Sequence, residues 1–208
     1  NGNPLIADTN NNRVIEVTPE GRIAFTTDEW SAGSGLLSDG SHLHYPNDAH
    51  LLDDGTLLIT DRNNDRCVIA TRGGHAVWEY SDGISHPHNC DPLANGHVLI
   101  ADSDGRAVLE VNRAKRVVWS YGAGRPELLA WPRDADRLPN GNTLITDSKN
   151  HRVIEVTPAG QIVWQYAVNY FANFYEADKL PNGNVLISDQ QHKQVLEVDG
   201  AGQVVWSW

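Results

Sequence analysis

Hydrophobic positions along this chain come in short runs that never sustain a helical period. Residues 133–166 are the clearest example, because runs rich in Val, Ile, Thr and Trp alternate there with Pro-Asn-Gly, Lys-Asn and Pro-Ala-Gly. Short β-branched and aromatic runs bounded by such residues are typical of strands joined by tight turns. No stretch combines a 3.6-residue apolar period with helix caps. The pattern therefore predicts an all-β protein.

The same set of strands is repeated along the whole chain. The second strand of each unit ends on an aspartate, and these anchoring aspartates are Asp8, Asp61, Asp102, Asp147 and Asp189. A period of about 40–45 residues with four strands per unit is typical of a β-propeller blade. We predict one β-propeller domain over residues 1–208 with five recognisable four-stranded blades, near residues 1–30, 47–80, 88–121, 133–166 and 175–208.

The first blade is expected to lack its inner strand. Asn1-Gly2-Asn3 matches the Asn-Gly-Asn that comes just before the second strand in later blades. Propellers usually close by completing one blade from both ends of the chain, which leaves no exposed edge. The sequence also contains no methionine. We expect a longer or processed parent chain; the alternatives are a three-stranded first blade and a six-bladed parent ring.

Two repeated columns are assigned to packing. The outer strands carry Phe25, Trp78, Trp119, Trp164 and Trp206 at one position, and Thr27, Tyr80, Tyr121, Tyr166 and Trp208 two residues later. One large aromatic residue per blade is expected to fill the space between neighbouring sheets. The anchoring aspartates are expected to accept hydrogen bonds from the following turn. Their expected ion-pair partners, five residues later, are Arg13, Arg66 and Arg152.

Composition removes several classes of function. A net charge of −11 and a pI near 5.1 argue against a nucleic-acid partner, because phosphate binding needs a basic surface. No apolar run approaches the ~18 residues that a membrane span needs. Two cysteines, Cys67 and Cys90, are too few for a disulfide framework, and their redox state stays open. The seven tryptophans and the repeats favour an extracytoplasmic location, periplasmic or secreted.

Two segments resemble a known repeat. IADTNNNRVIEVTPEG (residues 6–21) and ITDSKNHRVIEVTPAG (residues 145–160) look like NHL repeats, which build propellers. The wider pattern, with Asp-Ala-Asp on the inner strand, a Pro-Asn-Gly turn and Val-Trp-x-Tyr on the outer strand, is similar to the propeller of bacterial arylsulfotransferases. The resemblance covers essentially the whole chain. It implies the fold more than the activity, because the matching residues are mostly those that make blades.

Connections on one face of the propeller are expected to carry the function. The turns on the opposite face are short and uniform, whereas the links between blades, near residues 30–46, 81–87, 122–132 and 167–174, are long and varied. Variable loops on a regular scaffold are where binding concentrates. We call these two sides the loop face and the turn face. The candidate ligand-binding residues on the loop face are Tyr45, His86, Trp131, Tyr170, Phe171 and Tyr175.

The inner strands should line a central channel with polar side chains. Alternate positions carry Asp48, His50, Asn89, Asp91, Asp134, Asp136, Glu176 and Asp178. So many carboxylates make a channel-bound divalent cation such as calcium a candidate ligand, with ordered water as the alternative. A second candidate metal site, for zinc or copper, is His86, His88 and Cys90, which are spaced by two. Pro87 distorts that strand.

Two functions are consistent with this sequence. The favoured one is non-catalytic recognition of a partner protein, peptide or glycan through the loop face, because NHL-type repeats most often serve as scaffolds, including in larger assemblies. The alternative is implied by the arylsulfotransferase resemblance: His88 accepts a sulfuryl group, supported by His44, His50 and Arg133. It requires His88 to lie within a few ångströms of at least one of these three. The chain does not match a full set of that family's catalytic positions.

Overall fold

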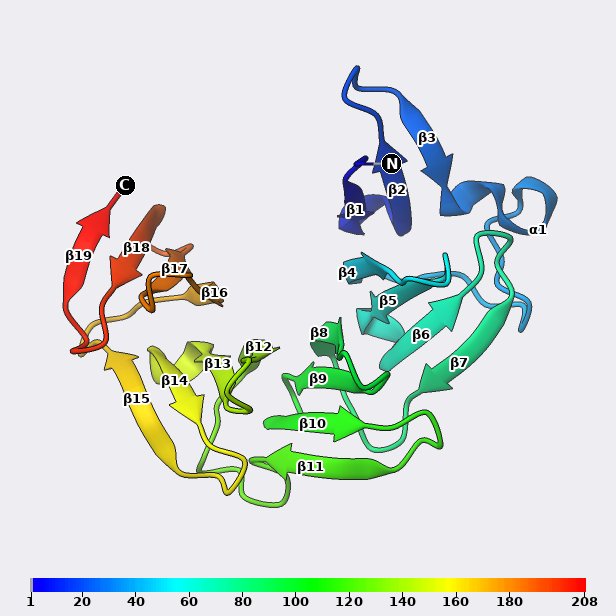
Figure 1. Ribbon diagram of the computed structural model, residues 1–208. Helices are drawn as coiled ribbons and strands as arrows, with labels where there is room; N and C mark the ends of the chain where they lie inside the picture. The colour runs from blue at the N-terminus through cyan, green and yellow to red at the C-terminus, as the bar shows by residue number, and fades with distance from the viewer. Residues whose placement is uncertain (1) are drawn as a thin grey trace.

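Five antiparallel sheets stand side by side around a common centre in the computed structural model, which describes residues 2–208 (Figure 1). Blades 2 to 5 have four strands each and blade 1 has three. The prediction of an all-β, five-bladed propeller is therefore confirmed, as is the missing inner strand of blade 1. The expected Asn1–Asn3 turn begins outside the described residues. Blades 1 and 5 flank an opening in Figure 1.

The strands of each blade follow one another from the centre to the rim. Blade 1 comprises β1 (Leu5–Asp8), β2 (Arg13–Val17) and β3 (Ile23–Thr26). Blade 2 comprises β4 (Pro46–Leu51), β5 (Leu57–Asp61), β6 (Arg66–Ala70) and β7 (Ala76–Tyr80). Blade 3 comprises β8 (Pro87–Pro92), β9 (Val98–Asp102), β10 (Ala107–Val111) and β11 (Val117–Tyr121).

Blade 4 comprises β12 (Pro132–Arg137), β13 (Thr143–Asp147), β14 (Arg152–Val156) and β15 (Ile162–Ala167). Blade 5 comprises β16 (Phe174–Lys179), β17 (Val185–Asp189), β18 (Gln194–Val198) and β19 (Val204–Ser207). The helical segments are short: α1 (Trp30–Gly33) and the 3-10 turns Thr9–Asn11, Thr27–Glu29, Arg62–Asn64 and Ser148–Asn150. No helix in the described part of the chain is long and apolar enough to cross a membrane.

The aromatic column of the outer strands joins each blade to the next. Fully buried aliphatic side chains fill the space between sheets, and the tryptophans pack at the outer end of this core. Each indole Nε1 also donates to a backbone carbonyl in the turn of the following blade. The three bonds are Trp78 to Arg113 (3.1 Å), Trp119 to Pro158 (2.9 Å) and Trp164 to Asp199 (3.2 Å). The packing role predicted for this column is what the structure shows in blades 2 to 4.

A cation from the following blade completes this contact. Lys179 of blade 5 lies 5.6 Å from the centre of the Trp164 ring and 3.2 Å from Glu155 of blade 4. Arg137 repeats the arrangement one blade earlier, over Trp119 and against Glu110. In blade 5 the equivalent Trp206 is 48% exposed, with neither a carbonyl nor a cation against it among the described residues. Trp206 therefore shows the environment that a tryptophan of this column has when no following blade packs against it.

The predicted partners of the anchoring aspartates are confirmed. Nε of the arginine five residues later donates to the aspartate at 2.8 Å in blades 1 and 2 and at 2.7 Å in blade 4. Ala107 and Gln194 stand in place of the arginine in blades 3 and 5. In blade 3 burial raises the pKa of Asp102 to about 6, because no guanidinium offsets the cost of burying the charge.

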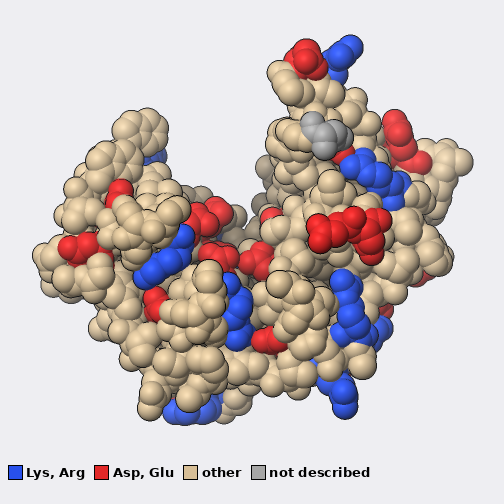
Figure 2. Space-filling model, viewed as in Figure 1, with Lys and Arg blue, Asp and Glu red and all other residues tan. Residues whose placement is uncertain are grey.

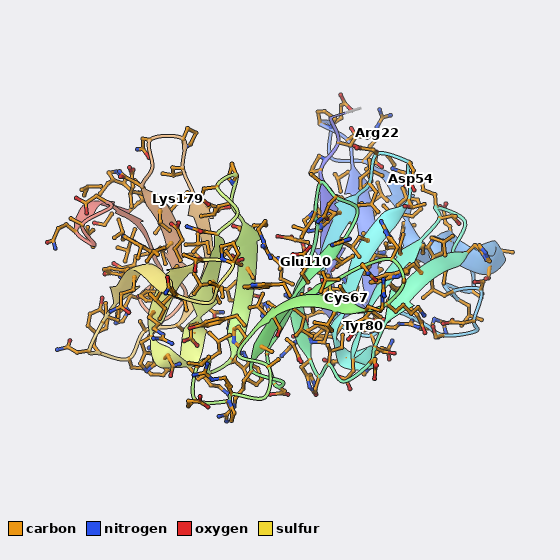
Figure 3. All side chains as sticks on the ribbon, turned by 60° about the horizontal axis from the view of Figure 1, so that its bottom comes forward. Arg22, Asp54, Cys67, Tyr80, Glu110 and Lys179 are labelled. Atoms are coloured by element: carbon orange, nitrogen blue, oxygen red, sulfur yellow. A yellow bond between two sulfur atoms is a disulfide. The ribbon has the colours of Figure 1, made fainter. Side chains whose placement is uncertain are left out.

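A disulfide bond joins blades 2 and 3. Cys67 on β6, labelled with its strand partner Tyr80 in Figure 3, is bonded to Cys90 on β8, with the two Cα atoms 6.2 Å apart. Sequence alone left the state of these cysteines open, because their spacing does not reveal that β6 and β8 become neighbours. The bond fixes the inner strand of blade 3 to the core of blade 2.

Trp164→Ala should lower the free energy of unfolding by about 3 kcal/mol, because it removes a half-buried aromatic ring and leaves a cavity between blades 4 and 5. Trp206→Ala is the matched control and should cost less than about 1 kcal/mol, because Trp206 is 48% exposed and no following blade within residues 2–208 packs against it. Urea unfolding of both variants measures the difference. Equal losses would contradict the inter-blade role of the column.

Replacing both cysteines by alanine should cost about 3 kcal/mol, because the bond closes a loop of 23 residues and restricts the unfolded chain. Thermal unfolding of the double variant, compared with the oxidised and the reduced wild-type protein, checks this value. A reduced wild-type protein as stable as the oxidised one would show that the bond contributes nothing.

Candidate functional site

Each inner strand begins with a β-bulge at its loop-face end. In β4, Pro46 pairs with Asp61 but Asp48 pairs with Thr60, so Asn47 is an extra residue. The same shift occurs at the start of β8, β12 and β16. A bulge redirects side chains that strict alternation would turn away. Two consecutive residues of each inner strand therefore line the channel: Asn47 and Asp48, His88 and Asn89, Arg133 and Asp134, Tyr175 and Glu176.

The first residues of these pairs, together with Arg62, form the channel mouth (Asn47, Arg62, His88, Arg133 and Tyr175). The Asn47 amide donates to the carbonyl of His88 at 2.7 Å and lies 3.0 Å from its Nδ1. The Tyr175 ring meets the His88 ring edge-on, with 5.0 Å between centres. The Arg133 guanidinium lies over the Tyr175 ring, 4.6 Å from the ring centre. Asn47, His88, Arg133 and Tyr175 line a cavity of about 80 Å³ together with the second residues of the four pairs.

His88 is a neutral imidazole in this arrangement. It is only 5% exposed, and burial together with the charges of Arg133 and Arg62 lowers its pKa to about 3. Because the Asn47 amide can only donate, Nδ1 accepts and the ring proton lies on Nε2. Neither ring nitrogen therefore offers a free lone pair to a substrate: Nδ1 accepts a hydrogen bond and Nε2 carries the proton.

Below the mouth lies an acidic layer (Asp48, His50, Asp91, Asp134, Asp136, Glu176 and Asp178), around a cavity of about 360 Å³. Carboxylates gather at the centre of the sheets in Figure 2. Nε2 of His50 lies 2.6 Å from Asp48 and 3.0 Å from Asp91. Burial disfavours the charge on His50, but the two carboxylates outweigh it and raise the pKa to about 10. His50 is therefore the cation that holds this layer together.

Two other carboxyl groups of the layer have pKa values raised above the ordinary value of an aspartate. Burial and the charges of Asp91 and its neighbours raise the pKa of Asp136 to about 8. Burial and Asp136 raise the pKa of Asp134 well above its ordinary value. Asp134 accepts from the Asn89 amide and from the backbone N–H of Ala177, both at 3.2 Å. Like charges this close cannot all ionise together, so the layer carries less charge than its composition suggests.

One group of side chains in the acidic layer could hold a metal ion. Ligand atoms of Asp48, His50 and Asp91 all lie within 4.8 Å of one another. These donors would suit a divalent cation, which would take the place of the proton on His50. The zinc or copper site expected at His86, His88 and Cys90 is ruled out by the disulfide, because Cys90 is bonded to Cys67 and offers no thiolate.

The loop face carries a rim of aromatic or imidazole rings, each beside a charged or imidazole partner. One such pair lies at each of the first three boundaries between consecutive blades, and two pairs lie at the boundary of blades 4 and 5. The pairs are Tyr45–Arg62, His86–Asp104, Trp131–Lys149, Phe171–His151 and Tyr170–His192. Phe171 is 64% exposed and Tyr170 is 44% exposed. Large exposed rings of this kind are typical of recognition surfaces.

Three rim residues are held in a left-handed backbone conformation: Tyr45 (φ 57°), His86 (φ 49°) and Trp131 (φ 61°). Bulky residues adopt this conformation at an energetic cost, which the surrounding structure must meet. Each directly precedes the proline that opens an inner strand. The left-handed backbone before blades 2, 3 and 4 therefore turns one ring at each of these blades onto the loop face.

In blades 2 to 4 the anchoring aspartates fix the residue just before a rim position, and in blade 5 the aspartate fixes Asn173, two residues after Phe171. Asp61 accepts from the N–H of His44 at 2.7 Å, and Asp147 accepts from the N–H of Ala130 at 2.7 Å. Asp102 and Asp189 do the same for Ser85 (2.9 Å) and Asn173 (3.2 Å). These four aspartates are at most 1% exposed. A buried carboxylate with backbone donors is a strong, directional tether, so the loop face is held from inside the blades.

The structure places the candidate catalytic residues in three different environments. His88 and Arg133 share the channel mouth, and His50 lies in the acidic layer. His44 is exposed and lines a separate cleft of about 600 Å³ at the boundary of blades 1 and 2. Sequence reasoning missed Asn47 and Arg62. The available signal was the pair of consecutive polar residues after each inner-strand proline, which simple alternation does not explain.

Fold and site together define a β-propeller with a polar central channel and a tethered, variable loop face. The family model of the outer membrane protein assembly factor BamB (PQQ_2) matches residues 10–207, and the chain belongs to this family. The resemblance to NHL and arylsulfotransferase propellers therefore holds at the level of the β-propeller. A search of curated proteins found no match.

Solved structures with the same fold have different functions. A protein of unknown function from Bacteroides caccae is 18% identical, with a TM-score of 0.73 over 99% of this chain and 77% of its own. A streptogramin B lyase is 13% identical, with a TM-score of 0.72 over 100% of this chain and 65% of its own. The WD40 propeller of Doa1 is 13% identical, with a TM-score of 0.72 over 94% and 60%. This chain thus spans less than two thirds of the last two, and the likeness shows the fold alone.

Asp136→Asn should remove part of the pH dependence of stability. The folded pKa of about 8 lies above the ordinary value of 3.8, so the stabilisation from protonated Asp136 is complete below about pH 4 and is lost as the pH rises through about 8. We expect the variant to melt above the wild type at about pH 9 and close to it at about pH 4. Asp53→Asn, an exposed site with the same charge change, is the control and should show no such divergence.

Proposed function

We propose that this chain is a non-catalytic binding propeller that recognises a partner protein through its loop face. The observation that carries the proposal is the rim of five rings, each beside a charged or imidazole partner, of which Phe171 and Tyr170 are exposed. Rigid aromatic side chains on tethered loops give large contact area at a small entropic cost. The name of the family, an assembly factor, supports a protein among the candidate partners, which also include a peptide and a glycan.

We further propose an extracytoplasmic location. Two observations support it: the disulfide between Cys67 and Cys90, which persists in oxidising compartments, and the outer-membrane role named in the family description. A protein that assembles with outer-membrane components would meet its partner there. The net charge of −11 is compatible with a protein partner and unfavourable for an anionic lipid surface.

Sulfuryl transfer is the second candidate, and one observation favours it: His88 and Arg133 line the same cavity. Three observations favour binding instead. Nδ1 accepts from the Asn47 amide and Nε2 carries the proton, the ring is 5% exposed, and about 80 Å³ is too little for an aryl sulfate. Histidine chemistry at this position would need the Asn47 contact to break first.

Site-specific photo-crosslinking in cells of the source organism tests the binding proposal. A benzoylphenylalanine at position 171 should give a discrete adduct with one partner protein, because this side chain is the most exposed ring of the rim. The same residue placed at Gln161, an exposed turn-face position, is the control and should give none. Loss of the adduct on adding Trp131→Ser would tie it to the rim. Equal labelling from both faces, or none from position 171, would contradict the proposal.

A further inference from the structure

Two arginines at the channel mouth have no carboxylate partner. None of the ion pairs in the described part of the chain involves Arg62 or Arg133. Their Nε atoms are shielded from solvent and have no hydrogen-bond partner within residues 2–208. The guanidinium groups lie against rings instead, over Tyr45 and Tyr175. A half-buried cation without an anion is unfavourable, so an anion should bind here readily.

The positive charge of the arginines acts on other groups of the channel mouth. Burial is the largest cause of the depressed pKa values of Arg133 and His88; the charge of Arg62 lowers both further, and the charge of Arg133 also lowers the pKa of His88. Elsewhere in the chain, Arg66 and Arg152 show the usual solution, a short ion pair with a buried aspartate. In a chain of net charge −11, these two arginines have no ion pair within residues 2–208, although Asp48, Asp134 and Glu176 line the same cavity as Arg133.

The carboxyl groups of the neighbouring acidic layer do not fill this role. Asp48 is engaged by His50 at 2.6 Å, and Asp134 accepts hydrogen bonds from Asn89 and Ala177, while burial raises its pKa well above the ordinary value. Glu176 lines the same cavity but makes no ion pair within 4 Å of either arginine. Repulsion from this layer limits how deep an anion can enter, so the favourable position lies at the arginine level.

We propose that the channel mouth binds a carboxylate on the Arg133 guanidinium, beside His88 and Tyr175, with Arg62 as a second cation nearby. A guanidinium fork matches the two oxygens of a carboxylate, and stacking on a tyrosine holds the fork flat without using its N–H groups. The cavity of about 80 Å³ is large enough for one such group and too small for a larger ligand. The inference rests on the proposed function for the source of the carboxylate, which is an acidic side chain or the C-terminus of the bound partner.

NMR titration of the purified protein tests the site without the partner. The probes are N-acetylglutamate N-methylamide and its glutamine counterpart, which differ in charge but hardly in shape. The Nε–H signals of Arg62 and Arg133 should be observable, because both atoms are shielded from solvent. We expect the glutamate probe to shift both signals and the glutamine probe to leave them in place. No shift with either probe, or the same shift with both, would overturn the proposal.

Arg133→Gln should weaken binding of the glutamate probe by on the order of tenfold to hundredfold, as the loss of a hydrogen bond to a charged group does. Arg113→Gln is the matched control, because Arg113 also lies over a ring, that of Trp78, but on the turn face. It should leave the affinity unchanged. Arg62→Gln repeats the test from the opposite side of the mouth if Arg133→Gln does not fold. Wild-type affinity in both channel-mouth variants would overturn the assignment.

Titration with inorganic sulfate tests whether the site binds a free tetrahedral anion rather than a carboxylate of the partner. If it shifts the two arginine signals at lower concentration than the glutamate probe does, the site belongs to a free tetrahedral anion and the carboxylate assignment is wrong. Weaker binding of sulfate supports the carboxylate. Sodium chloride at equal ionic strength controls for screening of the arginine repulsion. Probe binding without a crosslink from position 171 would leave the site standing and remove the proposed partner function.

Discussion

The buried anchoring aspartate is the interaction on which the rest of the molecule depends. It ends the second strand, binds an arginine of the third strand in three blades, and in blades 2 to 5 accepts the backbone N–H of the link that leads into its own blade. One side chain thus joins strand, turn and link. In blades 2 to 4 the link residue comes just before a rim ring, so the same bond that closes the blade also positions part of the loop face.

Bulges in the inner strands give the channel its two levels. With strict alternation, only every second residue of an inner strand would face the channel. The bulge lets one more residue of each strand face it, and these residues are Asn47, His88, Arg133 and Tyr175. A positive mouth therefore lies next to an acidic layer. The separation explains how His88 and His50, only one level apart, have pKa values shifted in opposite directions, to about 3 and about 10.

Features that repeat were predictable from the sequence, and features that depend on one blade meeting another were not. The aspartate–arginine pairs, the aromatic column and the three-stranded first blade follow from spacing within a repeat. The Cys67–Cys90 bond and the contact of Arg133 with Tyr175 join residues of different blades, and no periodicity encodes their distance. His44 shows the same limit, since its place beside the inner strand suggested the channel while its backbone N–H is turned to Asp61 and its side chain to another cleft.

Amide hydrogen exchange at Ala130 tests most directly whether the aspartates hold the loop face. In the wild type its N–H is bonded to Asp147, which is fully buried, and should be strongly protected. In Asp147→Asn the tether is weakened, so this amide should exchange faster by a larger factor than amides in β13 and β14. A uniform loss of protection throughout blade 4 would show instead that the aspartate stabilises the blade alone. Unchanged protection at Ala130 would contradict the account.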